Sequence, residues 1–202
     1  RVDEVGEGVL LGERLAVLVP VAPHLAAAHA TERAIRTVLV WGRSPAKAAA
    51  VATALRRNGL PAEAAPDLGA AVRAADIVTC ATTSAVPLVR GADVRPGTHV
   101  DLVGAFRRDM RESDDALIAR SAVYVDTYGG ALAEAGDLLQ PAAAGSWSTD
   151  RVRGDLHELC AGLRAGRGDA GEVTVFKSVG SAIEDLVAAE LVAGDLPSAP
   201  AG

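Results

Sequence analysis

The stretch "TVLVWGRSPAKAAAVATALRRNG", residues 37–59, has the pattern of a strand followed by a turn and a helix. Residues 37–42 form a short run rich in β-branched side chains, which favours a strand. Pro45 suits the first turn of a helix, and Gly59 suits the position just after a helix end. The stretch therefore predicts one strand–helix unit of an α/β protein.

The same unit recurs along the rest of the chain. Apolar strand candidates alternate with helical stretches, as in a parallel sheet that is covered on both faces. The sequence therefore predicts an α/β, Rossmann-like doubly wound fold with a mostly parallel sheet and helices on both faces. Residues 15–30 begin like a first strand and helix. The further strand candidates are residues 74–83, 97–105, 121–127 and 172–180, and the further helical stretches are residues 67–75, 111–121, 155–166 and 181–194.

Three parts of the chain are expected to differ in role. We predict an atypical N-terminal segment at residues 1–21, a nucleotide-binding domain at 22–180, and a helix with a disordered tail at 181–202. Residues 140–155 are rich in Gly, Ser and Pro, and we expect a loop there. In the final helix, one face carries mostly apolar residues and needs something to cover it. These residues are Ile183, Leu186, Val187, Glu190 and Leu191.

Composition restricts the class of protein. The formal net charge of −6 argues against a nucleic-acid partner, which favours a basic surface. Only Cys80 and Cys160 are present, which is neither a disulfide framework nor a metal-ligand spacing. His24 and His29 are five residues apart, and position 161 after His157 is alanine, so no metal site is expected. With no signal peptide or membrane-spanning run, we expect a cytoplasmic protein without a membrane partner.

The carboxyl ends of the strands are where a sheet of this class binds its ligand. After the first strand of the quoted stretch come Arg43 and Ser44, a guanidinium beside a hydroxyl. An Arg at this place suits the 2′-phosphate of NADP(H), whereas NAD(H) is usually read by a carboxylate. The alternative is an arginine in solvent and a serine that caps the following helix.

The ends of two other strands carry further candidates. Thr82, Thr83 and Ser84 offer three successive hydroxyls to a cofactor, although such residues also cap helices and start turns. The segment "VGAFRRDMRE", residues 103–112, combines a glycine with arginines and acids. It is either a substrate clamp or a loop with solvated charges.

Several strings, in this order, resemble the ornithine cyclodeaminase/mu-crystallin family. That family consists of NAD(P)-dependent enzymes that act on amino acids and cyclic imines. The resemblance extends over about residues 22–192 and is strongest for the third and fifth strings taken together. The strings are "VWGRSPAKAAAVA" (40–52), "DIVTCATTSAVPLV" (76–89), "HVDLVGAFRRDMRE" (99–112), "YVDTYGGALAEAGDL" (124–138) and "TVFKSVGSAIEDLVAAELV" (174–192).

The resemblance implies a set of cofactor-binding residues at the strand ends. It implies NADP(H) rather than NAD(H), a small imino or amino acid as substrate, and the family's homodimer. Arg43 and Ser44 match the NADP-selecting position; Thr82, Thr83 and Ser84 the segment along the cofactor; Val103 and Gly104 the loop near the nicotinamide; and Lys177, Ser178, Val179 and Gly180 a turn facing the nicotinamide and substrate.

One position separates the activities of the family. The cyclodeaminases have an aspartate as acid/base where this chain has Phe106, and phenylalanine cannot transfer a proton. Asp109 lies three residues later, and Arg108 stands where proline is usual. The segment is more similar to the imine reductases, which reduce pyrroline-2-carboxylate or piperideine-2-carboxylate with NADPH. The alternatives are ornithine cyclodeamination, a non-catalytic NADP-binding module, or an inert remnant.

The N-terminal part departs from the family. Its members have a Gly-x-Gly turn that lets the backbone approach the cofactor's pyrophosphate, whereas this chain has Val19-Pro20-Val21. The family's substrate and dimerisation domain is also expected to be largely absent. The hypothesis that follows is that residues 1–21 derive from a shifted reading frame or another change of the gene.

Overall fold

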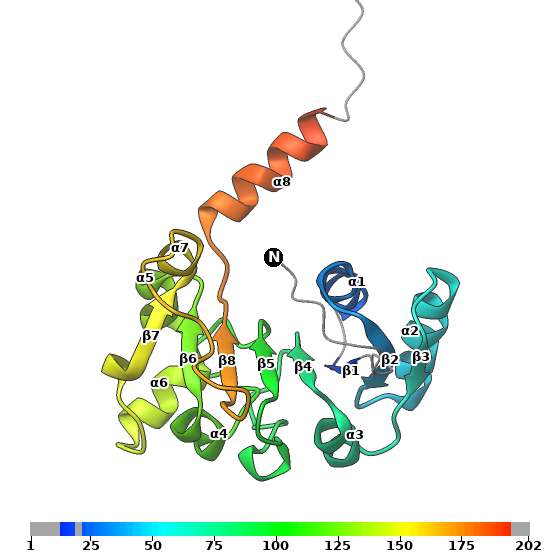
Figure 1. Ribbon diagram of the computed structural model, residues 1–202, viewed down its shortest axis with the longest axis horizontal. Coiled ribbons are helices and arrows are strands. Elements are labelled where there is room, and N and C mark those ends of the chain that lie inside the picture. Colours follow the sequence, from blue (N-terminus) through cyan, green and yellow to red (C-terminus); the bar gives the residue numbers. More distant parts are fainter. Residues whose placement is uncertain (1–12, 19–21, 195–202) are drawn as a thin grey trace, which may run out of the picture.

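A computed structural model describes residues 13–18 and 22–194 of the chain, and it has one eight-stranded sheet at its centre (Figure 1). All neighbouring strands are parallel, in the order β3-β2-β1-β4-β5-β8-β6-β7. This confirms the predicted Rossmann-like α/β fold. The strands are β1 (Glu13–Leu18), β2 (Ile35–Trp41), β3 (Ala62–Ala64), β4 (Ile77–Cys80), β5 (His99–Leu102), β6 (Ala122–Val125), β7 (Val152–Asp155) and β8 (Thr174–Lys177).

Helices lie on both faces of this sheet. α3, α4, α5 and α6 contribute to a core of buried residues on one face, and α1 and α2 pack on β1 and β2 on the other face. The helices are α1 (Ala22–Glu32), α2 (Pro45–Arg57), α3 (Leu68–Ala74), α4 (Asp115–Arg120), α5 (Tyr128–Glu134), α6 (Gly136–Ala143), α7 (Leu156–Cys160) and α8 (Ala182–Gly194), with 3₁₀ turns η1 (Gly91–Asp93) and η2 (Thr149–Arg151).

The quoted strand–helix unit forms as predicted, as β2 and α2. The Ser44 side chain accepts a hydrogen bond from Lys47 N at 3.4 Å, and Pro45 follows it at the start of the helix. Gly59 has φ +84° just after the helix, a conformation that favours glycine. Capping and turn chemistry therefore set both ends of α2.

The alternation of side chains along β1 divides the core. Ala16 and Leu18 belong to the cluster with α3 to α6, whereas Leu15 and Val17 belong to the cluster with α1 and α2. All four side chains are buried, and β1 pairs with both β2 and β4. Residues 13–18 of the segment predicted to be atypical are thus a central strand of the sheet.

The prediction of a loop at residues 140–155 is wrong in part. This stretch contains the end of α6, the turn η2 and the strand β7. Pro141 and Leu138 are buried on α6, and burial offsets the backbone hydrogen bond that proline cannot make. The sequence signal of a loop came from Pro141, Gly145 and the serines that follow, which occupy the helix and the short connection after it.

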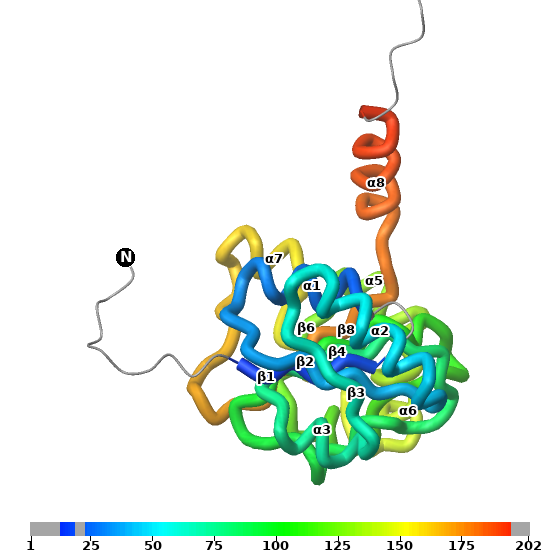
Figure 2. Tube along the Cα trace, turned by 90° about the vertical axis from the view of Figure 1, so that its right-hand side faces the viewer, coloured from blue at the N-terminus to red at the C-terminus, as the bar shows by residue number. Residues whose placement is uncertain are grey.

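The last helix, α8, projects from the body at the end of β8 (Figure 2). None of its side chains is buried, and Ile183 and Leu191 are each 68% exposed. Val192 is 65% exposed and lies half a turn around the helix from Ile183, so apolar side chains are not confined to one face. The predicted tail at 195–202 lies outside the described residues.

Candidate functional site

The carboxyl edge of the sheet is the place where this topology creates a binding crevice. The chain proceeds from β1 to β2 on one side and places β4 on the other side of β1. Ligands of doubly wound sheets bind at such a switch point, outside the carboxyl ends of the strands. The predicted residues follow β2, β4 and β5, or end and follow β8, so they all belong to this edge.

The end of β2 offers a cation and a helix start. Arg43 is exposed, and none of the residues that the structure describes forms an ion pair with it. Ser44 is half-buried and caps α2, as the alternative interpretation expected. The capping role of Ser44 is compatible with a phosphate-binding role of Arg43. A phosphate at the start of a helix can accept hydrogen bonds both from backbone N–H groups and from a guanidinium group.

The three hydroxyls after β4 have different surroundings. Thr82 is almost buried, and its Oγ1 accepts a hydrogen bond from Ser84 N at 3.3 Å. The Ser84 hydroxyl donates to Val86 O at 2.7 Å, so both hydroxyls stabilise the local turn. Thr83 is exposed. The structure therefore leaves Thr83 as the freest hydroxyl of the three toward a ligand.

The loop after β5 carries Phe106, at the position that is predicted from the sequence to distinguish the activities of the family that the chain resembles. Val103 is half-buried and donates its N–H to Cys80 O at 2.8 Å, which joins the loop to the end of β4. Gly104 is buried beside Thr82. Phe106 is 43% exposed, and its N–H donates to Gly104 O at 3.0 Å. An exposed aromatic ring at this edge offers an apolar contact and no proton.

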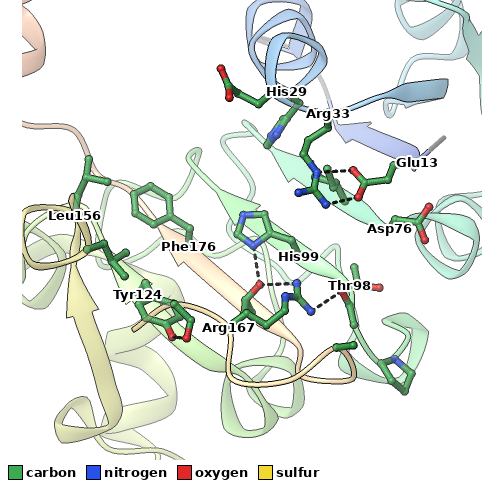
Figure 3. A pocket seen from close by; sticks show the side chains of 18 of the residues that line it. Glu13, His29, Arg33, Asp76, Thr98, His99, Tyr124, Leu156, Arg167 and Phe176 are labelled. Carbon is green, nitrogen blue, oxygen red and sulfur yellow. Dashed lines mark hydrogen bonds and ion pairs between the residues drawn. The ribbon is translucent and has the colours of Figure 1, made fainter. Parts of the chain in front are cut away.

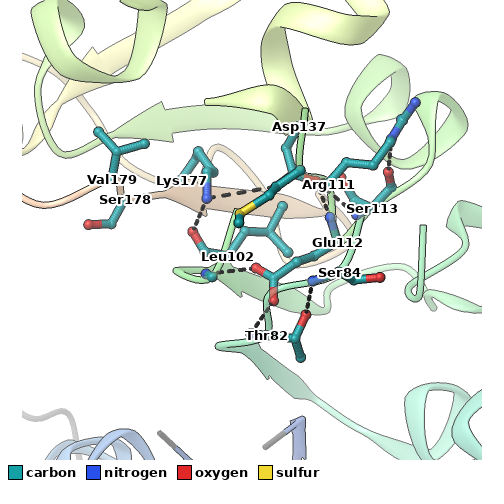
Figure 4. Close-up of polar contacts among 12 residues, drawn as sticks. Thr82, Ser84, Leu102, Arg111, Glu112, Ser113, Asp137, Lys177, Ser178 and Val179 are labelled. Atoms are coloured by element: carbon teal, nitrogen blue, oxygen red, sulfur yellow. Dashed lines mark hydrogen bonds and ion pairs between the residues drawn. The ribbon is translucent and has the colours of Figure 1, made fainter. Parts of the chain in front are cut away.

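The side chain of Lys177 lies in the protein interior and does not face the surface. It is the last residue of β8 and fully buried, and its Nζ donates to Leu102 O at 3.1 Å (Figure 4). The same Nζ lies 3.7 Å from Asp137 Oδ2. Its ammonium group thus belongs to the interior below the edge, among groups that the sequence did not single out.

The turn after β8 is held by a buried acid. Asp126 Oδ2 accepts hydrogen bonds from Ser178 Oγ at 3.0 Å, Val179 N at 2.7 Å and Gly180 N at 2.8 Å. Gly180 has φ +89°, which favours glycine at this turn. Asp126 follows β6 directly, so it connects the ends of β6 and β8. The sequence placed it inside a matching string but gave it no role.

A groove lies at the opposite edge of the sheet from the predicted residues. It has a volume of about 1050 Å³ and opens between α1 and α7, where no helix covers this face of the sheet in the part of the chain that the structure describes (Figure 3). Its lining includes the first residues of four strands, so it belongs to the amino edge and not to the predicted cofactor edge. These residues are Glu13, Ile77, His99 and Thr174.

Polar side chains form two short chains beside this groove. His29 Nε2 lies 3.1 Å from Thr79 Oγ1, which donates to Asp101 Oδ2 at 2.8 Å. His99 Nδ1 lies 2.8 Å from Thr174 Oγ1, and burial lowers the pKa of His99 although Asp101 opposes the shift. Residues 13–18 and 22–194 contain no group of three or more His, Cys, Asp or Glu arranged to hold a metal ion.

The match to known proteins agrees with this arrangement. The model of the ornithine cyclodeaminase/mu-crystallin family matches residues 21–198. The chain belongs to this family. A Δ1-pyrroline-2-carboxylate reductase of Paracoccus denitrificans is 45% identical over 161 residues, which are 79% of this chain and 50% of that protein. Protein SAR DEFICIENT 4 of Arabidopsis thaliana is 39% identical over 201 residues, 95% of this chain and 62% of that protein.

A solved structure shows the same fold with a ligand. The Δ1-pyrroline-2-carboxylate reductase of Thermococcus litoralis, in complex with NADH and L-proline, superposes with a TM-score of 0.85 and 32% identity. The match covers 89% of this chain and 57% of that one. The chain thus spans about half to three fifths of the length of these relatives. None of the described helices is long and apolar enough to cross a membrane.

Proposed function

We propose that this chain is the cofactor-binding part of an NADPH-dependent reductase of cyclic imino acids such as pyrroline-2-carboxylate. The observation that carries the proposal is the carboxyl edge itself: the family's matching segments meet there, at the switch point of a parallel sheet. Relatives with the name pyrroline-2-carboxylate reductase support the substrate class.

The described residues fit a dinucleotide at this edge. α1 begins at Ala22, shortly after β1 ends at Leu18, so its first backbone N–H groups lie near the switch point. Arg43 and the start of α2 suit the 2′-phosphate, which is our reason for proposing NADP(H). Val19, Pro20 and Val21, on which the prediction about the phosphate loop falls, lie outside the described residues.

The chemistry needs positioning more than proton transfer from residue 106. A bound reduced nicotinamide supplies a hydride. The imine carbon gains this hydride and the nitrogen carries a proton, which gives a cyclic amino acid. Because Phe106 has no ionisable group, we propose that it packs against the substrate ring and excludes water. A cyclodeaminase would need an acid/base at that position.

A fluorescence titration with NADPH and NADH tests the cofactor. Trp41 is the last residue of β2, two residues before Arg43, so a bound adenosine would change its emission. We expect saturable binding with NADPH preferred, and Arg43→Ala should remove the preference while NADH binding stays the same. Equal affinity of the wild type for both cofactors would contradict the assignment of Arg43.

An activity assay then separates two functions. We expect loss of reduced-nicotinamide absorbance when pyrroline-2-carboxylate is added, and none with ornithine and oxidised cofactor. The sequence Val19-Pro20-Val21, which lacks the family's Gly-x-Gly turn, favours a second candidate, a chain without catalysis that is either a binding module or an inert remnant. Binding without turnover would support the module, and no binding of either cofactor would support the remnant.

Two further properties belong to the proposal. Light scattering tests whether this chain forms the family's homodimer, because the family's dimerisation domain is expected from the sequence to be largely absent. The cytoplasm is the proposed location, since Cys80 and Cys160 are both free thiols, as is usual in a reducing compartment.

A further inference from the structure

Glu112 is a fully buried acid between two strands of the carboxyl edge (Figure 4). Its Oε1 accepts a hydrogen bond from Thr82 N at 2.6 Å, and its Oε2 accepts one from Gly104 N at 2.8 Å. Thr82 is the second residue after β4 and Gly104 the second after β5, so the two donors occupy corresponding places. One carboxylate therefore bridges the loops that follow two adjacent strands.

The main chain around Glu112 is held from two further directions. Asp137 Oδ1, at the start of α6, accepts hydrogen bonds from Glu112 N and Ser113 N, both at 2.8 Å. The carbonyl of Glu112 accepts from Leu88 N and Val89 N, also at 2.8 Å each. Hydrogen bonds therefore hold both the backbone and the side chain of Glu112 in place. Because its two carboxylate oxygens bind Thr82 N and Gly104 N, the carboxylate group sets the distance between the loop after β4 and the loop after β5.

Three other ionisable side chains surround Glu112 in this interior. They are Asp137 on α6, Lys177 on β8 and the Cys80 thiol on β4. Burial, the largest cause, raises the pKa of Glu112, and Asp137 raises it further, whereas the bonds from Thr82 lower it. Buried charge is costly, and apolar residues of similar size often stabilise a core as well. The contribution specific to Glu112 is directional: it binds two backbone N–H groups at once.

We propose that Glu112 is a positioning residue, which sets the spacing between residues 82–84 on the cofactor side and residues 103–106 on the substrate side. This inference rests on the proposed function. Phe106 lies two residues after Gly104, so the same bridge that fixes Thr82 also fixes the loop that bears the aromatic ring. The bridge would then keep residues 103–106 at a constant distance from a cofactor bound along residues 82–84.

Glu112→Gln tests this role with little change of shape. A glutamine has one oxygen, so its NH₂ group would face one of the two N–H donors and lose that bond. Glu63→Gln is the matched control, because Glu63 is exposed on the edge strand β3. The readout is the dissociation constant for NADH from about pH 5, just above the ordinary pKa of a glutamate, to about pH 9. NADH is used because it lacks the 2′-phosphate, which itself titrates at about pH 6.

The expected result has two parts. Glu112→Gln weakens NADH binding about tenfold at the upper end of the range, as for the loss of one hydrogen bond to a charged group. It also flattens the pH profile, because the wild type binds more weakly once Glu112 is protonated and the glutamine is always neutral. A merely structural role would lower the melting temperature without removing the pH dependence. Wild-type affinity and an unchanged profile in folded Glu112→Gln would overturn the proposal.

A measurement on the wild type covers the case of a variant that does not fold. In ¹H–¹⁵N spectra, the amide signals of Thr82 and Gly104 should move together with pH, through one transition above the ordinary pKa of a glutamate. Independent or absent shifts would overturn the bridge. If the wild type binds neither NADH nor NADPH, the proposed function and the positioning role both fail. In that case a joint transition of the Thr82 and Gly104 amides would still show that Glu112 bridges the two loops. The spectra therefore distinguish a failure of the proposed function from a failure of the bridge.

Discussion

Gly104→Ala is the substitution for which the structure gives the sharpest expectation. A Cβ at this position would lie 2.0 Å from Thr82 O, 2.2 Å from Thr82 N and 2.5 Å from Glu112 Oε1. Two of these atoms are backbone, so no side-chain rotation relieves the overlap. The loops after β4 and β5 would have to separate by about 1.5 Å to restore van der Waals contact.

That separation removes the hydrogen bonds that Glu112 accepts from Thr82 N and Gly104 N. Hydrogen bonds to a charged group contribute about 1.5–3 kcal/mol each, and overpacking costs about 1–3 kcal/mol. We therefore expect a loss of about 5 kcal/mol in the free energy of unfolding, a large part of the 5–15 kcal/mol that is typical of a domain. The melting temperature should fall by about 10–20 °C at this chain length.

Urea unfolding followed by circular dichroism measures this change. Gly129→Ala is the matched control, because no atom lies within 4 Å of the added Cβ and Gly129 is inside α5. An alanine there should stabilise the protein by about 0.5–1 kcal/mol, as usual in a helix. If Gly104→Ala unfolds within about 1 kcal/mol of the wild type, the close approach of the two loops is not as described and the bridge through Glu112 is refuted.

Three further predictions concern other parts of the molecule. Asp126→Ala should cost about 2–4 kcal/mol in urea unfolding, because it leaves the N–H groups of the turn after β8 without their acceptor; wild-type stability would contradict this. Removal of residues 182–202 should change the melting temperature by less than about 2 °C, since no α8 side chain is buried, and should reduce self-association in light scattering. Cys160 should react with a thiol reagent in the native protein and Cys80 only after unfolding, because burial raises the pKa of Cys80 and encloses it; mass spectrometry of labelled peptides distinguishes the two.

The sequence predicted the central strands of the fold well and the edge strands poorly. β4, β5, β6 and β8 each place apolar side chains in the core shared with α3 to α6, and β2 places its own in the core shared with α1 and α2. Because these strands lie inside the sheet, their sequences carry the apolar pattern that predicts a buried strand. β3 has the sequence AEA and β7 has VRGD, and these are the two ends of the strand order. Edge strands are often short and polar, which protects a sheet from pairing with other chains. They therefore lack the hydrophobic pattern on which the sequence prediction depends.

The candidate site could be located from the sequence, but what holds it could not. The rule that ligands bind at the carboxyl edge selected the strand ends, and the structure places Thr82, Gly104 and Ser178 there. The groups that fix these loops are acids distant along the chain: Glu112 is 30 residues from Thr82, and Asp126 is 52 residues from Ser178. Spacing in sequence gives no signal for such pairs, because the crossing helices between parallel strands vary in length. Glu112 lies in the charged segment 103–112, whose sequence indicates a substrate clamp or a solvated loop, and Asp126 lies near the end of a strand candidate, so neither was expected to hold a loop.

Lys177 was predicted to face the nicotinamide and substrate, but in the structure its side chain is enclosed below the carboxyl edge. It connects β8 to β5 through Leu102 O and lies near Asp137, which in turn holds the main chain of Glu112. A strand-end lysine that faced solvent would be a candidate for a phosphate or a substrate carboxylate. Enclosed as it is, its charge opposes the charges of Asp137 and Glu112, and we expect it to act on the cofactor edge through the hydrogen bonds that hold Glu112. Substitution of Lys177 should therefore resemble the loss of the Glu112 bridge and not the loss of a direct ligand contact.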